Sequence, residues 1–220
     1  MPTRVALPDL DRIAARLEGA SASEIVEWAI DTFGRGISLA ASMADTVLID
    51  IATKVDPDIE VVFLDTGFHF AETLETLRRA QVRYGLNVRV ERPEPRASDL
   101  YAVGADSCCA VRKVALLDRA LADKDAWMTG LRRTEAPTRA NTPIVGYDSR
   151  GLVKVCPLAT WTDEDVDRYI AENDIIVNPL LFDGYPSIGC WPCTDRVAEG
   201  ADPRSGRWAG LGKTECGLHL

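Results

Sequence analysis

Short apolar runs alternate with amphipathic stretches along most of this chain, and this alternation limits the fold more than any other feature. Residues 59–67 have the pattern of a buried strand that ends in a turn, and residues 70–84 follow with apolar side chains at helical spacing. Strands are also expected at residues 86–90, 126–130 and 152–156, and helices at residues 21–33, 47–52, 109–121 and 162–172. Strands that alternate with helices predict an α/β fold, namely a parallel, twisted sheet with helices on both faces.

Two of the expected helices carry capping signals at their first residues. Ser21 is followed by Glu24, and Thr162 by Asp165, which is the spacing at which side chains satisfy the free N–H groups of a helix start. In the helix at residues 109–121, the side chains expected to face the core are Val111, Val114, Ala115 and Leu117.

The 220 residues are sufficient for one substantial core, so we expect a single domain over residues 1–220. After Asn178 the sequence becomes rich in Gly, Pro and Cys and loses its periodicity, which predicts an irregular C-terminal segment. Residues 201–220 form the last part of that segment, and we expect them to end in a mobile tail.

Charge and hydropathy argue against two classes of partner. The chain has 34 acidic and 25 basic residues and a formal net charge of −9, whereas a general nucleic-acid binder needs a basic surface. The first residues lack the apolar run of a signal peptide, and no stretch approaches the length of a membrane span. We therefore expect a cytoplasmic protein that binds neither nucleic acid nor membranes.

Polar loops follow three of the expected strands. In an open parallel sheet the ligand binds beyond the carboxyl ends of the strands. Those ends lie at residues 38–45, 65–67 and 130–139, and all three contain small residues, polar residues or arginines. Residues 38–45 also precede a helix, as phosphate-binding loops do, although the glycines of such loops are missing. An anionic ligand is expected here, with Ser42 and Asp65 as candidate contacts.

Four of the six cysteines fall into two pairs, Cys108-Cys109 and Cys190-x-x-Cys193. In a reducing cytosol such thiols indicate metal binding or catalysis rather than disulfides. The spacing allows an iron–sulfur cluster, a tetrahedral zinc ion or a redox pair at Cys190 and Cys193. The redox pair is the weakest of these, because no hydrophobic strand precedes it. Adjacent cysteines suit a cluster somewhat better than a single ion, because each iron takes its own thiolate.

The other two cysteines are isolated. Cys156 lies in an apolar strand and is expected to be a buried core thiol. Cys216 lies in the terminal sequence Lys-Thr-Glu-Cys-Gly-Leu-His-Leu, with no second cysteine close by in the chain. A thiol on a terminal segment can enter a site and leave it again, and nearby cations can stabilise its thiolate. Cys216 is therefore either a nucleophile or a tail thiol without a role, and His219 has the same two interpretations.

Basic side chains gather in two loops. Guanidinium groups bind phosphate and sulfate oxygens through paired, directional hydrogen bonds. The loop at residues 130–139 follows a strand and faces the expected ligand crevice, whereas residues 201–208 lie in the irregular segment. Lys113 follows Cys109 by one helical turn and would lie near the negative charge of a cluster. The arginines of the two loops are Arg132, Arg133, Arg139, Arg204 and Arg207.

Taken in order, these motifs resemble one enzyme family. The set consists of Cys-Cys-x-x-Arg-Lys at residues 108–113, Gly-Leu-Arg-Arg at 130–133 with Arg139, Gly-Cys-x-x-Cys at 189–193 and Glu-Cys-Gly-Leu-His at 215–219. It resembles the bacterial, iron–sulfur type of assimilatory adenosine 5'-phosphosulfate (APS) reductase, within the phosphoadenosine phosphosulfate reductase family. The resemblance runs from about residue 38 to the C-terminus and implies an adenine-nucleotide α-hydrolase-like fold.

The resemblance implies a role for most of the candidates. It implies a 4Fe-4S cluster on Cys108, Cys109, Cys190 and Cys193, and it makes Cys216 the nucleophile. It associates Lys113, Arg132, Arg204, Arg207 and His219 with the charged end of the substrate or with the cluster. With the candidates from the strand ends added, the expected substrate-binding residues are Ser42, Asp65, Lys113, Arg132, Arg133, Arg204, Arg207 and His219.

The implied reaction is the thiol-dependent reduction of APS to sulfite and AMP through an S-sulfonate on Cys216, in sulfate assimilation and cysteine biosynthesis. Thioredoxin or a similar dithiol protein would supply the second thiol, and the cluster would act structurally and electrostatically. One alternative is the reduction of 3'-phosphoadenosine 5'-phosphosulfate, although enzymes for that substrate commonly lack the cluster cysteines. Another is a zinc-stabilised nucleotide-binding module in which Cys216 is dispensable.

Two further points follow from the same comparison of motifs. A tRNA-thiolating enzyme of the same superfamily conflicts with the acidic balance and with residues 40–45, which lack the Ser-Gly-Gly signature of the related ATP pyrophosphatases. That missing signature also argues against ATP cleavage. The sequence leaves the oligomeric state open, a homo-oligomer included.

Overall fold

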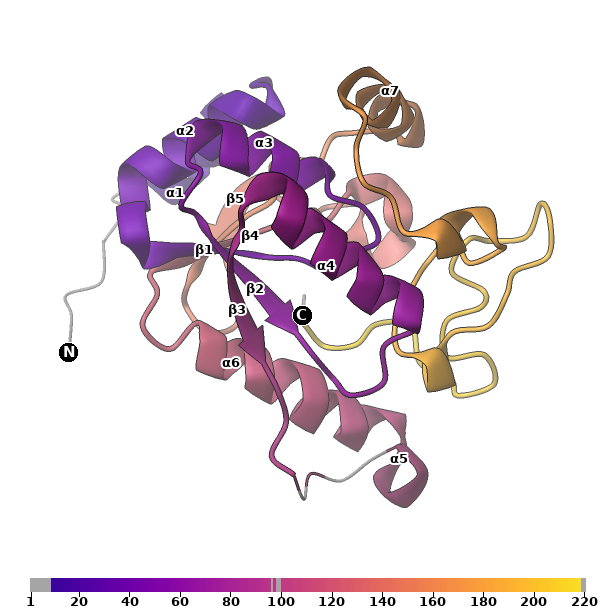
Figure 1. Ribbon diagram of the computed structural model, residues 1–220. Helices are drawn as coiled ribbons and strands as arrows, with labels where there is room; N and C mark the ends of the chain where they lie inside the picture. Colours follow the sequence, from indigo (N-terminus) through magenta and orange to yellow (C-terminus); the bar gives the residue numbers. More distant parts are fainter. Residues whose placement is uncertain (1–8, 96, 98–99, 219–220) are drawn as a thin grey trace.

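The computed structural model describes residues 9–95, 97 and 100–218, and a six-stranded sheet lies at its centre (Figure 1). The strands are β1 (Ile37–Ala40), β2 (Glu60–Leu64), β3 (Asn87–Glu91), β4 (Ala126–Thr129), β5 (Val145–Tyr147) and β6 (Val153–Val155), in the order β3-β2-β1-β4-β6-β5. Five of them are parallel, which confirms the predicted fold class, but β5 runs antiparallel to β6. The sequence did not predict β5, because three residues are too few to show a strand periodicity.

The strand order contains one reversal that matters for function. The chain passes from β1 through β2 to β3 on one side and then returns to place β4 on the other side of β1. Leu39 of β1 accordingly lies between Val61 of β2 and Met128 of β4. A crevice forms outside the carboxyl ends of the strands at such a switch point, because the loops after β1 and β4 leave in opposite directions.

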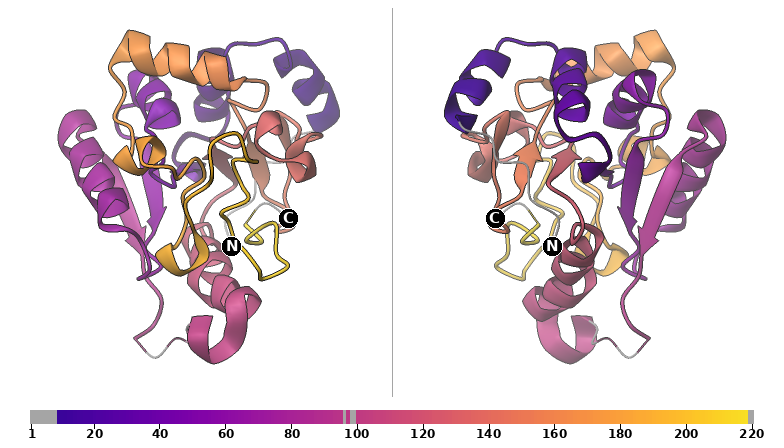
Figure 2. Two further views of the ribbon diagram at one scale, coloured as in Figure 1. Left: turned by 90° about the vertical axis from the view of Figure 1, so that its right-hand side faces the viewer. Right: turned by 90° about the vertical axis from the view of Figure 1, so that its left-hand side faces the viewer.

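Helices cover both faces of the sheet. They are α1 (Leu10–Leu17), α2 (Ala22–Phe33), α3 (Val47–Val55), α4 (Ala71–Tyr84), α5 (Leu100–Cys109), α6 (Ala115–Ala120) and α7 (Asp163–Asn173). Figures 1 and 2 show α6 on the opposite side of the sheet from α2 and α3, as right-handed crossovers from a switch point require. Both expected capping boxes are present, at Ser21 with Glu24 and at Thr162 with Asp165. Helix α1 was not predicted.

The helical region around the first cysteine pair differs from the prediction. A helix was expected to start at Cys109, but α5 already begins at Leu100, with a bend at Gly104, whose φ of 80° is easy only for glycine. A π-helical turn, Ala110–Val114, then separates α5 from α6. Such a turn adds one residue and rotates the faces that follow it. For this reason Val111 and Ala115, expected in the core, are exposed, and Leu116 is buried beside Leu117.

The main core lies between the sheet and α2 and α3, where Ile25, Val26, Leu39, Val61 and Met128 are buried. Beyond Asn178 the chain is irregular, as expected, and contains two short 3-10 turns, Pro179–Phe182 and Trp191–Cys193. In the views of Figures 1 and 2, this segment lies at the carboxyl ends of the strands. Among the described residues, the helices are all too short or too polar to cross a membrane.

Candidate functional site

A cavity opens at the carboxyl ends of β1, β2 and β4, which is the position predicted for the ligand crevice. Three loops line its polar part: Ser42 and Asp45 follow β1, Thr66 follows β2, and Arg132 follows β4. The loop after β1 leads directly into the first turn of α3, where backbone N–H groups and the helix dipole favour an anion.

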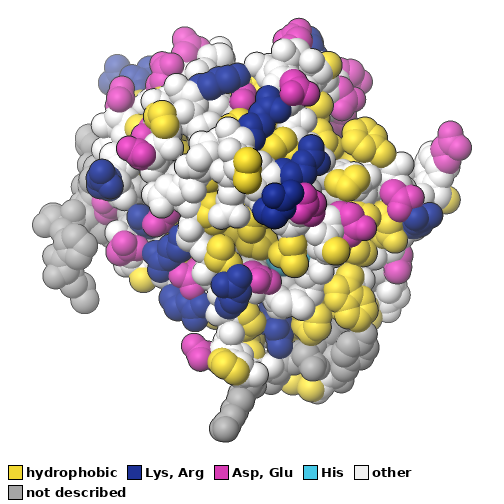
Figure 3. Space-filling view, viewed as in Figure 1, with side chains coloured by type: hydrophobic (Ala, Val, Ile, Leu, Met, Phe, Trp, Pro, Cys, Tyr) yellow, Lys and Arg dark blue, Asp and Glu magenta, His cyan; other side chains and the backbone are white. Residues whose placement is uncertain are grey.

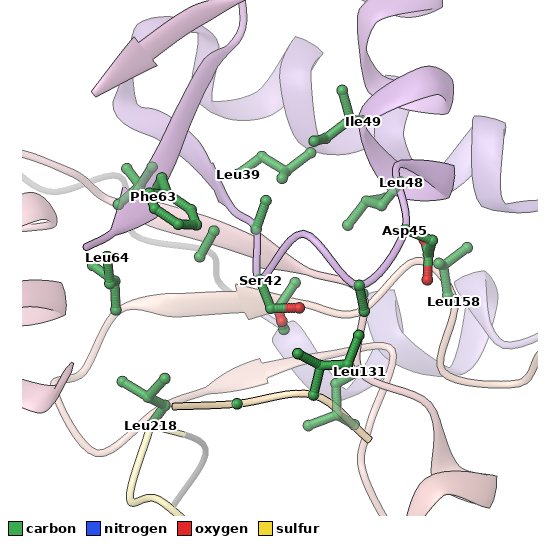
Figure 4. Close-up of a pocket in the computed structure, with 18 of the residues that line it drawn as sticks. Leu39, Ser42, Asp45, Leu48, Ile49, Phe63, Leu64, Leu131, Leu158 and Leu218 are labelled. Carbon is green, nitrogen blue, oxygen red and sulfur yellow. The ribbon is translucent and has the colours of Figure 1, made fainter. Parts of the chain in front are cut away.

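Aliphatic and aromatic side chains form the other walls of this cavity. Figure 4 shows Leu39, Phe63 and Leu64 on the side of β1 and β2, and Leu131 on the opposite side. Leu218, from the last described residue of the chain, also reaches this wall. An apolar wall beside a polar loop suits a ligand with a flat, apolar ring and a charged end.

Three cationic side chains border the cavity. Lys113 comes from the π-helical turn, and Arg132 and Arg139 come from the loop after β4. Two of them are held in place by carboxylates: Arg132 donates to Asp163 at 2.6 Å, and Arg139 donates to Glu135 at 2.5 Å. Fixed guanidinium groups are suited to the oxygens of phosphate or sulfate.

A second, smaller cavity lies beside the first. Its lining contains the thiols of all four paired cysteines, namely Cys108, Cys109, Cys190 and Cys193. Lys113 lines both cavities and is therefore placed between them. The two cysteine pairs, separated by about 80 residues of chain, thus meet in space.

Burial and mutual repulsion govern the ionisation of these thiols. Burial raises the pKa of Cys108, and charge on Cys109 and Cys190 adds to the rise. Burial also raises the pKa of Cys109 and of Cys193, against which Lys113 acts in the opposite direction. A cationic group bound among these thiols would stabilise their thiolates, so the four cysteines are a favourable donor set for such a group.

The four cysteines around the second cavity are a suitable donor set for an iron–sulfur cluster. Within the part of the chain that the structure describes, no three His, Cys, Asp or Glu side chains are arranged so that they could hold a single metal ion. In an iron–sulfur cluster each thiolate binds a separate iron, so the sulfur atoms do not have to converge on one point. The four cysteines around one cavity fit that donor pattern.

Arg204 and Arg207 of the C-terminal segment line neither cavity, but both lie against the ring of Trp208, which lines the smaller one. Arg207 is half-buried, donates to the Ser187 hydroxyl at 3.3 Å and to the Ile188 carbonyl at 3.2 Å, and lies against the ring of Trp208. Burial lowers the pKa of Arg207, and charge on Arg204 lowers it further. Its Nε, like the Nε1 of Trp208, is buried and has no hydrogen-bond partner among the described residues. The segment thus brings cationic and donor groups next to the four cysteines.

Among the described residues, four of the predicted substrate-binding residues are not in the cavity lining: Asp65, Arg133, Arg204 and Arg207. Arg133 turns away and pairs with Glu18, donating to its Oε2 at 2.9 Å. Asp65 accepts from the backbone of Gly67 and from Arg92 at 3.0 Å. His219 lies outside the described residues. Ser42, Lys113 and Arg132 do line the cavity.

The tail that carries Cys216 is docked against the protein. Lys213 forms a salt bridge with Asp106 of α5, and Leu218 packs against a small cluster around Leu117 and Trp127. Cys216 is partly buried, and it lies near enough to Cys109 for their charges to interact. Cys216 lines neither cavity, but its neighbour in the tail, Leu218, lines the larger one and Cys109 lines the smaller one.

Sequence reasoning underestimated two residues of this site. Arg139 was seen only as one of several arginines, yet it lines the cavity and bonds both carboxylate oxygens of Glu215. His69 lines the cavity as well, and its Nε2 lies 2.8 Å from the Leu64 carbonyl. Its position after β2, in the Gly-Phe-His turn, was the one available signal.

A mostly parallel sheet with a crevice at its switch point, next to a cavity lined by four cysteines, defines an α/β protein of the class that binds nucleotides at that crevice. Residues 36–196 match the family model described as a phosphoadenosine phosphosulfate reductase domain. The chain belongs to this family, which confirms the resemblance seen in the sequence.

Relatives and solved structures agree with that assignment. The chain is 50% identical to the adenosine 5'-phosphosulfate reductase of Rhodococcus opacus, over 96% of this chain and 95% of the relative. It is also 50% identical to the enzyme of the same name from Mycolicibacterium smegmatis, over 96% and 93%. The crystal structure of phosphoadenylyl-sulfate reductase from Candida auris, a phosphate complex, has a TM-score of 0.77 and 26% identity and covers 89% of this chain and 100% of that chain.

More distant structures share the fold alone. The FMN adenylyltransferase of Candida glabrata has a TM-score of 0.61 at 13% identity, covering 90% of this chain and 73% of that protein. This likeness is consistent with the adenine-nucleotide α-hydrolase-like architecture implied by the sequence.

Proposed function

We propose that this protein reduces adenosine 5'-phosphosulfate to sulfite and AMP in the cytoplasm, as the sulfite-forming step of sulfate assimilation and cysteine biosynthesis. The observation that carries this function is a cavity at the carboxyl ends of the strands beside a cavity lined by four cysteines, with Lys113 lining both. Cys216 lies two residues before Leu218, which lines the first cavity, and close to Cys109, which lines the second. The two relatives at 50% identity are named for this activity.

The cavity has complementary places for both ends of this substrate. Adenine and ribose fit between the apolar walls at Leu39, Phe63 and Leu131, and the phosphosulfate group lies toward the cations. Lys113 and Arg132 neutralise its oxygens, and the loop at Ser42 donates to the phosphate. We assign Arg204, Arg207 and His219 to the sulfate end on the basis of the family resemblance alone.

In the first half-reaction, the Cys216 thiolate attacks the sulfur atom of the sulfonyl group. A new S–S bond forms, the bond between that sulfur and the bridging phosphate oxygen breaks, and AMP leaves with the electron pair. The transferred group resembles a phosphoryl group, so fixed cations and correct placement supply most of the rate acceleration. The product on the enzyme is a thiosulfonate at Cys216.

In the second half-reaction, a thiolate of a dithiol protein such as thioredoxin attacks the Sγ of Cys216. Sulfite leaves with the electron pair of the broken S–S bond, and a mixed disulfide forms. The second thiol of the reductant then attacks the reductant's first sulfur atom in that mixed disulfide and releases the Cys216 thiolate. The dithiol supplies the two electrons, so sulfur is reduced from the sulfate level to sulfite and the reductant becomes a disulfide.

Cys108, Cys109, Cys190 and Cys193 would hold a 4Fe-4S cluster, which supplies structural cohesion and negative charge near the sulfonyl end when it is bound. Thiol attack on a sulfonyl group transfers an electron pair, so neither half-reaction needs a one-electron carrier. Lys113 lines both this site and the substrate cavity, so its positive charge would interact with the cluster and with the substrate.

The face seen in Figure 3 carries Lys and Arg side chains mixed with Asp and Glu, rather than a continuous basic surface. This mixture suits a small anionic substrate, recognised inside a cavity, better than a nucleic acid.

The test is intact-protein mass spectrometry, without reductant, on anaerobically purified protein incubated with adenosine 5'-phosphosulfate. We expect the mass of one added sulfonate, located on Cys216 by peptide mapping and removed by reduced thioredoxin with release of sulfite. The matched Cys216→Ser variant should gain no mass. An adduct formed only with 3'-phosphoadenosine 5'-phosphosulfate would overturn the choice of substrate, and no adduct with either nucleotide would overturn the reaction.

A further inference from the structure

The residue directly before the nucleophile candidate is held by a fork of hydrogen bonds. Arg139 donates through Nε to Glu215 Oε1 at 2.8 Å and through Nη2 to Glu215 Oε2 at 2.9 Å. The hydroxyl of Thr138 donates to Glu215 Oε1 at 3.1 Å. The side chain of Glu215 is only 8% exposed, so this is a largely desolvated, bidentate ion pair, which is the strongest arrangement available to these groups.

A second arginine supports the same stretch from the other loop. Arg204 donates to the carbonyl of Thr214 at 3.0 Å and lies 3.4 Å from Glu215 Oε2. Burial raises the pKa of Glu215, but the hydrogen bonds and charges of Arg139 and Arg204 outweigh it and bring the pKa below its usual range. The carboxylate thus joins two loops, 130–139 and 201–208, that were expected to bind substrate.

A different anchor holds the tail after the nucleophile. Gly217 has a φ of 84°, which turns the chain, and a β-carbon there would lie 3.4 Å from Val114. Leu218 then packs beside Leu117 and lines the substrate cavity. Cys216 therefore lies between two residues that fix the tail, Glu215 through an ion pair and Leu218 through apolar packing.

We propose that Glu215 is a positioning residue. Its ion pair with Arg139 holds the tail closed, so that Cys216 faces the sulfonyl end of the substrate. This inference rests on the proposed function and adds that Glu215 acts in only one of the two half-reactions. Glu215 accelerates the first half-reaction, which needs a closed tail. It does not assist the second, in which the reductant must reach the Cys216 sulfur and the tail has to open.

The alternative role for the same contact makes the opposite prediction. If Glu215 instead occupied the Arg139 fork that the substrate needs, removing its charge would tighten nucleotide binding and speed the reaction. The two roles are therefore distinguished by whether removing the charge of Glu215 slows or speeds S-sulfonate formation.

The test compares Glu215→Gln with Glu199→Gln, a matched change at an exposed glutamate of the same C-terminal segment. The glutamine keeps the size of the side chain and loses the charge-assisted fork. Three quantities are measured on the holoprotein: the single-turnover rate of S-sulfonate formation, the rate of its removal by reduced thioredoxin, and the affinity for AMP. Tryptic cleavage after Lys213 in the absence of nucleotide reports tail opening independently of any chemistry.

For Glu215→Gln we expect S-sulfonate formation to slow by about 10- to 100-fold, because displacement of a reacting atom by an ångström costs about that much. Removal of the sulfonate should not slow, AMP affinity should stay within about 2-fold, and cleavage after Lys213 should become faster. Glu199→Gln should match the wild type in all four measurements. Thr138→Val removes one hydrogen bond to Glu215 and leaves the Arg139 fork in place, so it should give a smaller change in the same direction. It also covers the case in which Glu215→Gln fails to fold.

Unchanged sulfonate formation with unchanged tail cleavage would overturn the inference, and so would faster sulfonate formation with tighter AMP binding. If the wild-type protein forms no sulfonate, the proposed function fails. In that case faster tail cleavage in Glu215→Gln would still support Glu215 as the anchor of the tail.

Discussion

The hydroxyl of Thr66 lies 3.3 Å from the Sγ of Cys190, and this contact joins the end of β2 to the C-terminal segment. The same hydroxyl accepts from the backbone N–H of Phe68 at 3.2 Å, and the N–H of Trp191 donates to the Phe68 carbonyl at 2.8 Å. The loop after β2 thus holds the segment that contains the second cysteine pair in position. Substrate cavity and thiol cavity share this loop, so a change in one is transmitted to the other.

Thr66→Val tests this coupling. The valine keeps the shape of the side chain but removes both polar contacts, and it leaves the N–H of Phe68 without its acceptor at a partly buried position. We expect the free energy of unfolding to fall by about 1–3 kcal/mol, together with a lower iron content and weaker visible absorbance after exposure to air. Thr66→Ser keeps the hydroxyl and serves as the control. Equal iron retention in the two variants would contradict the proposed link.

Adjacent Arg132 and Arg133 should differ in function. Arg132 lines the cavity, so we expect Arg132→Ala to raise the KM for adenosine 5'-phosphosulfate by about 10- to 100-fold, the value of a charge-assisted hydrogen bond of roughly 1.5–3 kcal/mol. Arg133 pairs with Glu18 outside the cavity, so Arg133→Ala should leave the KM unchanged and lower the free energy of unfolding by about 0.5–1 kcal/mol. Steady-state kinetics and urea unfolding measure the two effects. A KM increase in Arg133→Ala would restore the role expected from sequence.

The comparison of these neighbours shows where sequence reasoning ended. The alternation of apolar runs predicted the sheet, the position of its crevice and the loops that border it. Adjacent positions in a loop, however, point in different directions, and no periodicity reports which of two arginines faces the ligand. The motif placed Arg133 at the substrate, whereas Glu18, more than 100 residues earlier in the chain, holds it outside the cavity.

The same limit applies to long-range pairing. The cysteine spacing was visible in the sequence, but the meeting of Cys109 with Cys190 depends on tertiary contacts such as that of Thr66. The anchor of the tail was also hidden, because Arg139 and Glu215 are 76 residues apart and each has an ordinary local context. The π-helical turn at Ala110–Val114 rotated the face of α6 in a way that a regular 3.6-residue period does not predict.

Glu91 should make stability depend on pH. Burial raises the pKa of Glu91, but hydrogen bonds from Arg119 and from Arg89 outweigh it and lower the pKa below its usual range. A lowered pKa means that the charged form of Glu91 is favoured in the folded protein. Its contribution to the free energy of unfolding is fully present above the pKa of an ordinary glutamate, about 4.3, and is lost as the pH falls through the lower pKa of Glu91 in the folded protein. We expect Glu91→Gln to cost about 1–3 kcal/mol at pH 7.

Urea unfolding from pH 7 down to acid conditions measures that dependence. The difference between wild type and Glu91→Gln should shrink as the pH falls below about 4.3, because the wild-type carboxyl becomes neutral as well. Glu94→Gln is the control, since the Glu94 side chain is 83% exposed and lies 3.8 Å from Arg119. A difference that stays constant with pH would show that shape rather than charge explains the effect.

Cys156 and Cys216 should react very differently with an alkylating agent. Cys156 is completely buried, and burial raises its pKa to about 11, so at pH 8 its thiol is both neutral and inaccessible. Cys216 is partly exposed on the tail. In the native, cluster-loaded protein we expect iodoacetamide to modify Cys216 and to leave Cys156 unmodified, with peptide mapping as the measurement. Denatured protein is the control in which both are modified, and alkylation of Cys156 in the native protein at a rate close to that of Cys216 would contradict its place in the core.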